Sequence, residues 1–148
     1  CGDGGLDAWD RRQRLMCIRD RSVFDFDAVG VAEVVYADWC FLRIYRGTDG
    51  EVLFSRSASS GTGVELPVIA DVDGDFNSEI VVALTTGVAC PATDPIFTRG
   101  VSTFESQSGV LVLRDTLDRW AASRPIWNQH AYNVTNIRDD ATVPRTSE

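Results

Sequence analysis

The chain contains an internal repeat with a period of 46 residues, and this feature limits the possible folds more than any other. Residues 25–37 align with residues 71–83 without a gap, and five of the 13 aligned positions are identical. The identical pairs are Asp25/Asp71, Asp27/Asp73, Glu33/Glu79, Val35/Val81 and Ala37/Ala83. Repeats of this length are typical of propeller blades, in which each supersecondary unit packs against the next.

Each copy is predicted to form four short strands, because runs of β-branched and aromatic residues alternate with Gly, Pro, Ser and Asp. In the first copy the predicted strands cover residues 23–26, 32–36, 41–46 and 51–55. In the second copy they cover residues 67–70, 79–84, 109–114 and 123–128, with the polar stretch 85–108 as a long surface insertion. The predicted fold class is all-β, with two four-stranded antiparallel blades of a β-propeller.

This pattern divides the chain into a first blade at 22–60 and a second at 61–128, between an N-terminal remnant (1–21) and a C-terminal tail (129–148). A closed propeller usually needs about four to eight blades. We therefore expect the chain to be a fragment of a larger propeller, and we expect the neighbouring blades of the full-length protein to be among its partners.

The composition excludes several classes of partner. The chain has 22 acidic and 14 basic residues, all of them Arg, and a formal net charge of -8. A general nucleic-acid binder needs a basic surface against the phosphates, so we expect no nucleic-acid partner. There is no apolar run of about 18 residues, so no membrane span is predicted.

The cysteines leave two alternatives open. Cys1, Cys17, Cys40 and Cys90 include no C-x-x-C pair, which argues against a zinc knuckle or a thioredoxin-type redox site. Cys40 and Cys90 are the first candidates for a disulfide, which would indicate an oxidising compartment. Two unpaired buried thiols are the alternative.

The acidic loop from Asp71 to Glu79 has the spacing of a metal site. Side chains at its first, third and fifth positions can converge on one point in a tight loop between two strands. A backbone carbonyl near the seventh position and a carboxylate at the ninth can complete a shell of hard oxygen ligands, which suits Ca2+ better than zinc. The EF-hand pattern does not fit, because it needs an acid at its twelfth position and helical flanks. A solvated acidic turn is the alternative.

The two aligned loops resemble those of the FG-GAP and VCBS repeat family, whose members form integrin-α-like β-propellers. The resemblance rests on residues 71–79 followed by Ile80-Val81-Val82 and on residues 25–33 followed by Val34-Val35-Tyr36, and it extends from about Ser22 to Glu148. It implies that Ca2+ binds in the loop between the strands. The ligands that it implies for the main site are the side chains of Asp71, Asp73, Asp75 and Glu79 and the carbonyl of Asn77.

The sequence departs from the family pattern at two places. Phe76 stands where the family usually has Gly, which puts the tight turn there in question. In the first copy Ala28 and Val29 replace the usual Gly-Asp, so one ligand is lost. We expect that site to be weak or empty, with Asp25, Asp27 and Glu33 as its remaining ligands.

Residues 11–21 are similar to the translated sequence of a transposon-end adapter used in sequencing libraries. The segment holds five of the 14 arginines in an otherwise acidic chain. Without it, nine basic residues would face 21 acidic ones, because Asp20 is also removed, and the net charge would be -12. We interpret this segment as an assembly artefact and give it no role in function.

The resemblance implies a bacterial secreted or cell-surface protein. The predicted function is that of a Ca2+-binding module of such a protein, which binds a protein or glycan ligand, as adhesion modules do. No enzymatic activity is expected, because the chain has no G-x-S-x-G elbow and its single His leaves no obvious catalytic triad. Two alternatives remain: part of a propeller-based carbohydrate-active lyase or hydrolase, and a purely structural repeat.

Overall fold

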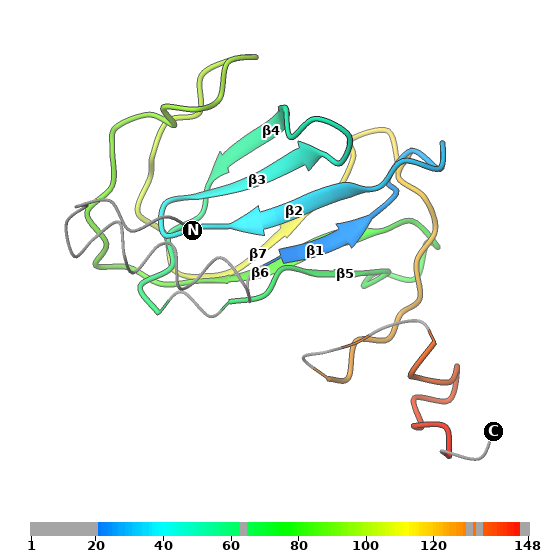
Figure 1. Cartoon of the computed structure of the whole chain (residues 1–148). Helices are drawn as coiled ribbons and strands as arrows, with labels where there is room; N and C mark the ends of the chain where they lie inside the picture. Colours follow the sequence, from blue (N-terminus) through cyan, green and yellow to red (C-terminus); the bar gives the residue numbers. More distant parts are fainter. Residues whose placement is uncertain (1–20, 63–64, 130–131, 133–134, 146–148) are drawn as a thin grey trace, which may run out of the picture.

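The computed structural model describes residues 21–62, 65–129, 132 and 135–145, which form two antiparallel β-sheets and no helix (Figure 1). The first sheet has four strands in chain order: β1 (Arg21–Phe24), β2 (Glu33–Ala37), β3 (Phe41–Arg46) and β4 (Val52–Ser57). The second has three: β5 (Val68–Ala70), β6 (Glu79–Leu84) and β7 (Gly109–Leu113). The all-β prediction is confirmed. Arg21 begins β1, whereas the rest of the adapter-like segment lies outside the described residues.

The predicted fourth strand of the second copy, residues 123–128, is wrong. The chain around it turns instead to the β5–β6 loop, where Ala122 forms an isolated bridge with Asn77. The Asp71 amide donates to the Arg124 carbonyl at 3.4 Å, and Pro125 has no amide hydrogen for a ladder. This stretch therefore bonds to the β5–β6 loop instead of pairing with β7 as a fourth strand.

The two sheets lie face to face with the hydrophobic core between them (Figure 1). Alternate residues of each strand point inward, as the two-residue period of a β-strand requires. Burying one such side chain stabilises the fold by about 1.5–3 kcal/mol. The buried cluster consists of Phe26, Val35, Ala37, Leu42, Ile44, Ala58, Ile69, Ile80, Val82, Leu84 and Leu111.

Residues 85–108 form the connection between β6 and β7, and they are anchored on the outer face of the first sheet. A disulfide joins Cys40 to Cys90, which decides between the two alternatives that the sequence left open. Arg43 lies on the face of β3 opposite to the core and pairs with the buried Asp94, at 2.6 Å between Nε and Oδ2. Phe104 packs edge-on against Phe41, with ring centres 6.1 Å apart.

Candidate metal centre

The loop between β5 and β6 folds around the buried carboxylate of Asp71. Its two oxygens accept hydrogen bonds from the amides of Gly74, at 2.7 Å, and Phe76, at 3.1 Å. The carboxylates of Asp73 and Asp75 each accept from the amide two residues further on, at 3.3 and 2.8 Å. Such side-chain to backbone bonds are typical of Asx turns, and they hold the loop tightly curled.

The curled loop brings three negative charges together. Carboxylate oxygens of Asp71, Asp73 and Asp75 lie within 4.8 Å of one another. Two unit charges about 4 Å apart repel by roughly 4 kcal/mol at an effective dielectric constant near 20. A bound divalent cation would replace this repulsion by attraction, so the cluster can hold a metal ion.

Glu79, the first residue of β6, lies buried beside this cluster with only 2% of its surface exposed. Its Oε2 accepts a hydrogen bond from the Val72 amide at 2.9 Å, whereas its Oε1 is buried and has no partner among the described residues. Burial raises the pKa of Glu79, the Val72 amide opposes this, and the charges of Asp73, Asp75 and Asp71 raise it further. An unpartnered buried carboxylate oxygen beside three carboxylates fits a site that binds a cation.

Asn77 is placed differently from these carboxylates. With its amide group oriented to donate, its side-chain nitrogen lies 3.0 Å from the carbonyl oxygen of Trp120 and 3.3 Å from that of Asp118. This contact engages the side chain with the segment after β7. The resemblance implies the main-chain carbonyl of Asn77 as the ligand, and this side-chain contact does not involve that atom.

The first copy, between β1 and β2, repeats this loop. Both oxygens of Asp25 accept backbone hydrogen bonds, from Val29 at 3.1 Å and from Gly30 at 2.7 Å. Glu33 Oε2 accepts from the Phe26 amide at 3.1 Å, which reproduces the bond from Val72 to Glu79 at the repeat offset of 46. Oxygens of Asp25, Asp27 and Glu33 lie within 4.8 Å of one another, so this cluster can also hold a metal ion.

Each loop passes twice through the left-handed region, at matching positions. In the first loop these are Ala28 (φ 56°) and Gly30 (φ 86°), and in the second Gly74 (φ 83°) and Phe76 (φ 74°). Each loop therefore has Gly at only one of the two positions that favour it. Phe76 adopts the tight conformation despite its side chain, so the departure from the family pattern does not prevent the turn.

The segment around Ala121, which no sequence motif marks, joins the two loops. The Ala121 amide donates to the Phe26 carbonyl at 2.7 Å, and Ser78 Oγ donates to the Ala121 carbonyl at 2.5 Å. The rings of Phe26 and Trp120 lie 4.7 Å apart. Both acidic loops are thus attached to one short stretch of chain, residues 120–121, which lies just before the strand predicted at 123–128.

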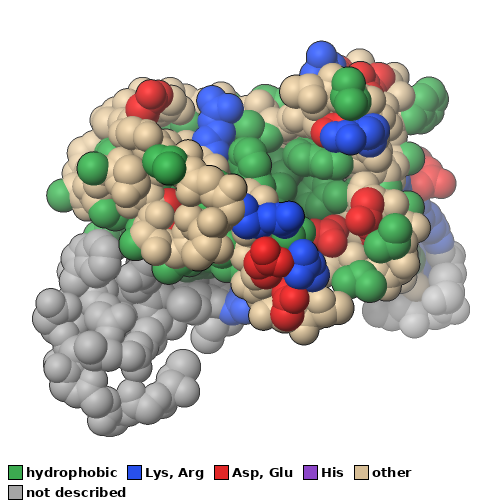
Figure 2. All heavy atoms as spheres, turned by 90° about the horizontal axis from the view of Figure 1, so that it is seen from above, with side chains coloured by type: hydrophobic (Ala, Val, Ile, Leu, Met, Phe, Trp, Pro, Cys, Tyr) green, Lys and Arg blue, Asp and Glu red, His purple; other side chains and the backbone are tan. Residues whose placement is uncertain are grey.

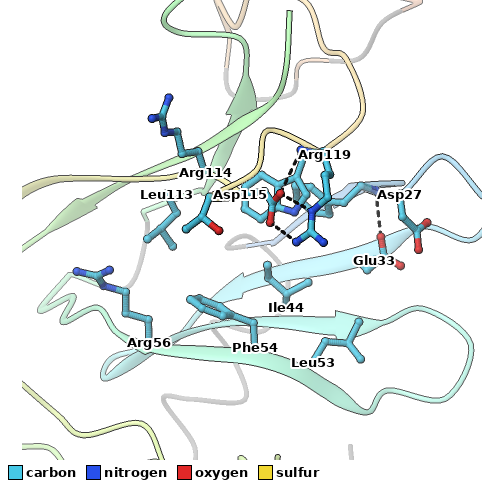
Figure 3. Close-up of a pocket in the computed structure, with 13 residues that line it drawn as sticks. Asp27, Glu33, Ile44, Leu53, Phe54, Arg56, Leu113, Arg114, Asp115 and Arg119 are labelled. Atoms are coloured by element: carbon cyan, nitrogen blue, oxygen red, sulfur yellow. Dashed lines mark hydrogen bonds and ion pairs between the residues drawn. The ribbon is translucent and has the colours of Figure 1, made fainter. Parts of the chain in front are cut away.

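A groove of about 710 Å³ opens beside the first loop, between β4 and the chain that follows β7. Figure 2 shows a hollow with an apolar floor and charged side chains around its rim. Asp27 and Glu33 belong both to this groove and to the first acidic cluster. Asp115 and Arg119 form a bidentate ion pair at its edge, with both N–O distances 2.8 Å (Figure 3).

Comparison with known proteins gives one informative similarity. No family model matches the chain, and no curated protein matches it. The crystal structure of the V. cholerae biofilm matrix protein Bap1 is similar, with a TM-score of 0.64 and 28% sequence identity. The match covers 85% of this chain and 19% of that chain, so the present chain spans about a fifth of Bap1. None of the described residues forms a helix long and apolar enough to cross a membrane.

Proposed function

We propose that the chain is a pair of Ca2+-binding blades of FG-GAP/VCBS type from a larger β-propeller, and that it serves as a binding or adhesion module. The observation that carries this proposal is the same loop occurring twice at an offset of 46 residues. In both copies the leading Asp accepts two backbone hydrogen bonds, and the closing Glu accepts one from the residue after that Asp. The limits of the two blades remain those predicted from the sequence.

The donor set supports calcium as the metal. The second loop offers carboxylate and carbonyl oxygens only, which are the ligands of hard cations. Its buried Glu79 Oε1 has no partner among the described residues and would gain one from the ion. The first loop has no carboxylate at Val29, the position that Asp75 fills in the second, so we assign it the lower affinity.

Two observations support a place outside the cell. The Cys40–Cys90 disulfide is typical of proteins that fold in an oxidising compartment. The similar solved structure is that of a biofilm matrix protein, which is consistent with an adhesion-like module. We assign no reaction to the chain, and turnover of a polysaccharide by the purified protein would contradict that assignment.

The test is the melting temperature of the wild-type protein and of Asp73→Ala, each with Ca2+ and with a chelator. We expect Ca2+ to raise the melting temperature of the wild type and to have no effect on Asp73→Ala, because one carboxylate of the cluster is gone. Asp49→Ala removes an exposed carboxylate outside both loops and should keep the full response. Equal melting of the wild type with calcium and with chelator would refute the metal assignment.

A further inference from the structure

The first sheet has four strands and the second has three, so, within the part of the chain that the structure describes, one strand of the first sheet has no strand opposite it across the core. The first strands of the two sheets, β1 and β5, lie in contact, and from there the sheets extend to β4 and to β7. On β4, Phe54 and Arg56 are paired in register with the core residues Ile44 and Leu42 and share their side of the sheet. Phe54 nevertheless has 37% of its surface exposed. A core-facing aromatic side chain left open marks the place of a missing strand.

The edge of β7 borders the same opening. Among the described residues β7 pairs only with β6, so the peptide groups along its other edge have no strand partner. An unpaired edge of this kind is a template for another strand. The apolar floor beside it is formed by Phe26, Ile44, Leu53, Phe54, Leu113 and Trp120.

The charges at the two ends of the groove differ in sign. Figure 3 shows Arg56 and Arg114 toward one end, and Asp27 and Glu33 toward the other. Arg56 forms no ion pair with any described residue, and the nearest carboxylate oxygen to Arg114 is 3.6 Å away. The arginine end is therefore suited to a carboxylate from an occupant.

We propose that this groove is a docking site for an extended strand of another polypeptide, which pairs with the free edge of β7 and lies opposite β4. Its inward side chains are apolar, and a carboxylate at one end meets Arg56. A second copy of this chain is the poorer occupant, because none of its edge strands (β1, β4, β5 and β7) contains an Asp or a Glu. The inference rests on the proposed binding role and names its class of partner.

The experiment measures binding of a fluorescent synthetic peptide in which valine and threonine alternate and which ends in glutamate. We expect saturable binding to the Ca2+-loaded protein, weakened about tenfold by Arg56→Glu, because the ion pair is replaced by repulsion. The same variant should prefer a peptide that ends in lysine. Arg99→Glu, an exposed arginine outside the groove, should bind like the wild type. N-methylation of alternate peptide groups should abolish binding, because it removes the donors of strand pairing.

The proposal would be overturned if neither the peptide that ends in glutamate nor the one that ends in lysine bound saturably to the wild-type protein. Equal binding of the N-methylated peptide would also overturn it, as would a dimer whose formation Arg56→Glu prevents. Circular dichroism of the Arg56 variant checks that its fold is intact. Asp73, the residue varied in the calcium melting experiment, does not line the groove. A protein whose melting responds to Ca2+ through Asp73 but which binds no peptide therefore separates failure of this inference from failure of the proposed function.

Discussion

At the scale of single residues, Glu79 and Phe76 adopt energetically unfavourable arrangements that the fold alone does not explain. Glu79 places a carboxylate oxygen without a hydrogen-bond partner in the interior beside three other acids. Phe76 holds a left-handed conformation with 76% of its surface exposed, so its ring adds little packing to offset the strain. Both lie in the loop assigned to Ca2+, where strain of this kind is commonly found.

Glu79→Gln should stabilise the metal-free protein while removing its response to Ca2+. The amide keeps an oxygen for the Val72 amide and removes a buried charge, so the free energy of unfolding should rise by on the order of 1 kcal/mol. Urea denaturation with chelator and with calcium measures both effects. Glu51→Gln, on the exposed β3–β4 turn, is the control that should retain the calcium response. A metal-free Glu79 variant less stable than the wild type would contradict the prediction.

Phe76→Gly should raise the free energy of unfolding by about 0.5–1 kcal/mol, because Gly adopts this φ without strain. Phe76→Ala is the matched comparison, since it removes the ring and keeps the strain, and it should give no gain. Thermal unfolding of the two variants at equal calcium concentration measures the difference. Equal stability of the two variants would show that the left-handed conformation at position 76 does not destabilise the loop.

At the scale of elements, the connection between β6 and β7 is bound to the first sheet by charge as well as by a covalent bond. Asp94 is fully buried and accepts hydrogen bonds from Arg43 at 2.6 and 3.0 Å, and Asp38 is bonded to the same guanidinium. Burial on its own would raise the pKa of Asp94, but the bonds from Arg43, Ser55 and the Ile96 amide hold it below its ordinary value. This polar cluster fixes a segment that would otherwise be a loose loop.

Because the pKa of Asp94 is lower in the folded state than in the unfolded state, its contribution to stability is present at neutral pH. It should be lost as the pH falls from the ordinary aspartate range through the lowered folded value. Asp94→Asn should lose about 3 kcal/mol of unfolding free energy at neutral pH and flatten this acid limb. Denaturant titrations from pH 7 downward check both, and Asp49→Asn, in an exposed pair, should change neither measurably. An unchanged acid limb in Asp94→Asn would contradict this assignment.

At the scale of the whole molecule, the outer face of the second sheet is apolar, and its β7 end is exposed. Val68, Val81 and Val112 stand in register across β5, β6 and β7. Val110 lies next to them, paired with Ala83, and has 69% of its surface exposed. In the proposed propeller the next blade would cover this face.

The separate 148-residue chain should therefore self-associate through this face. Val112→Glu should shift the protein toward monomer with little change in melting temperature, because Val112 is half exposed and its side chain leaves the core untouched. Sedimentation velocity over a range of concentrations measures the shift. Val101→Glu, an equally large change at an exposed position between β6 and β7, should leave association unchanged. Association that persists in Val112→Glu would place the interface elsewhere.

The sequence by itself determined the seven strands observed among the described residues and the two acidic loops, because strand periodicity, turn residues and carboxylate spacing are local properties of the chain. The observed strands of the first sheet lie within about two residues of the predicted ones. The first loop brings its three predicted acids together, whereas the second brings together Asp71, Asp73 and Asp75 and places Glu79 beside them. The 46-residue repeat also extends to the backbone, since the left-handed positions of the two loops match.

Only the tertiary structure decided which distant groups meet. Residues 123–128 were predicted to form a fourth strand, but the stretch 121–124 bonds to the two acidic loops instead of β7, and no local pattern distinguishes these competing partners. The same holds for Cys40 with Cys90 and for Arg43 with Asp94, which lie 50 and 51 residues apart in sequence. The groove under β4 is present because the stretch 121–124 bonds to the acidic loops and not to β7. It exists because the second sheet ends one strand before the first, and the number of strands in a sheet depends on contacts between segments far apart in the chain.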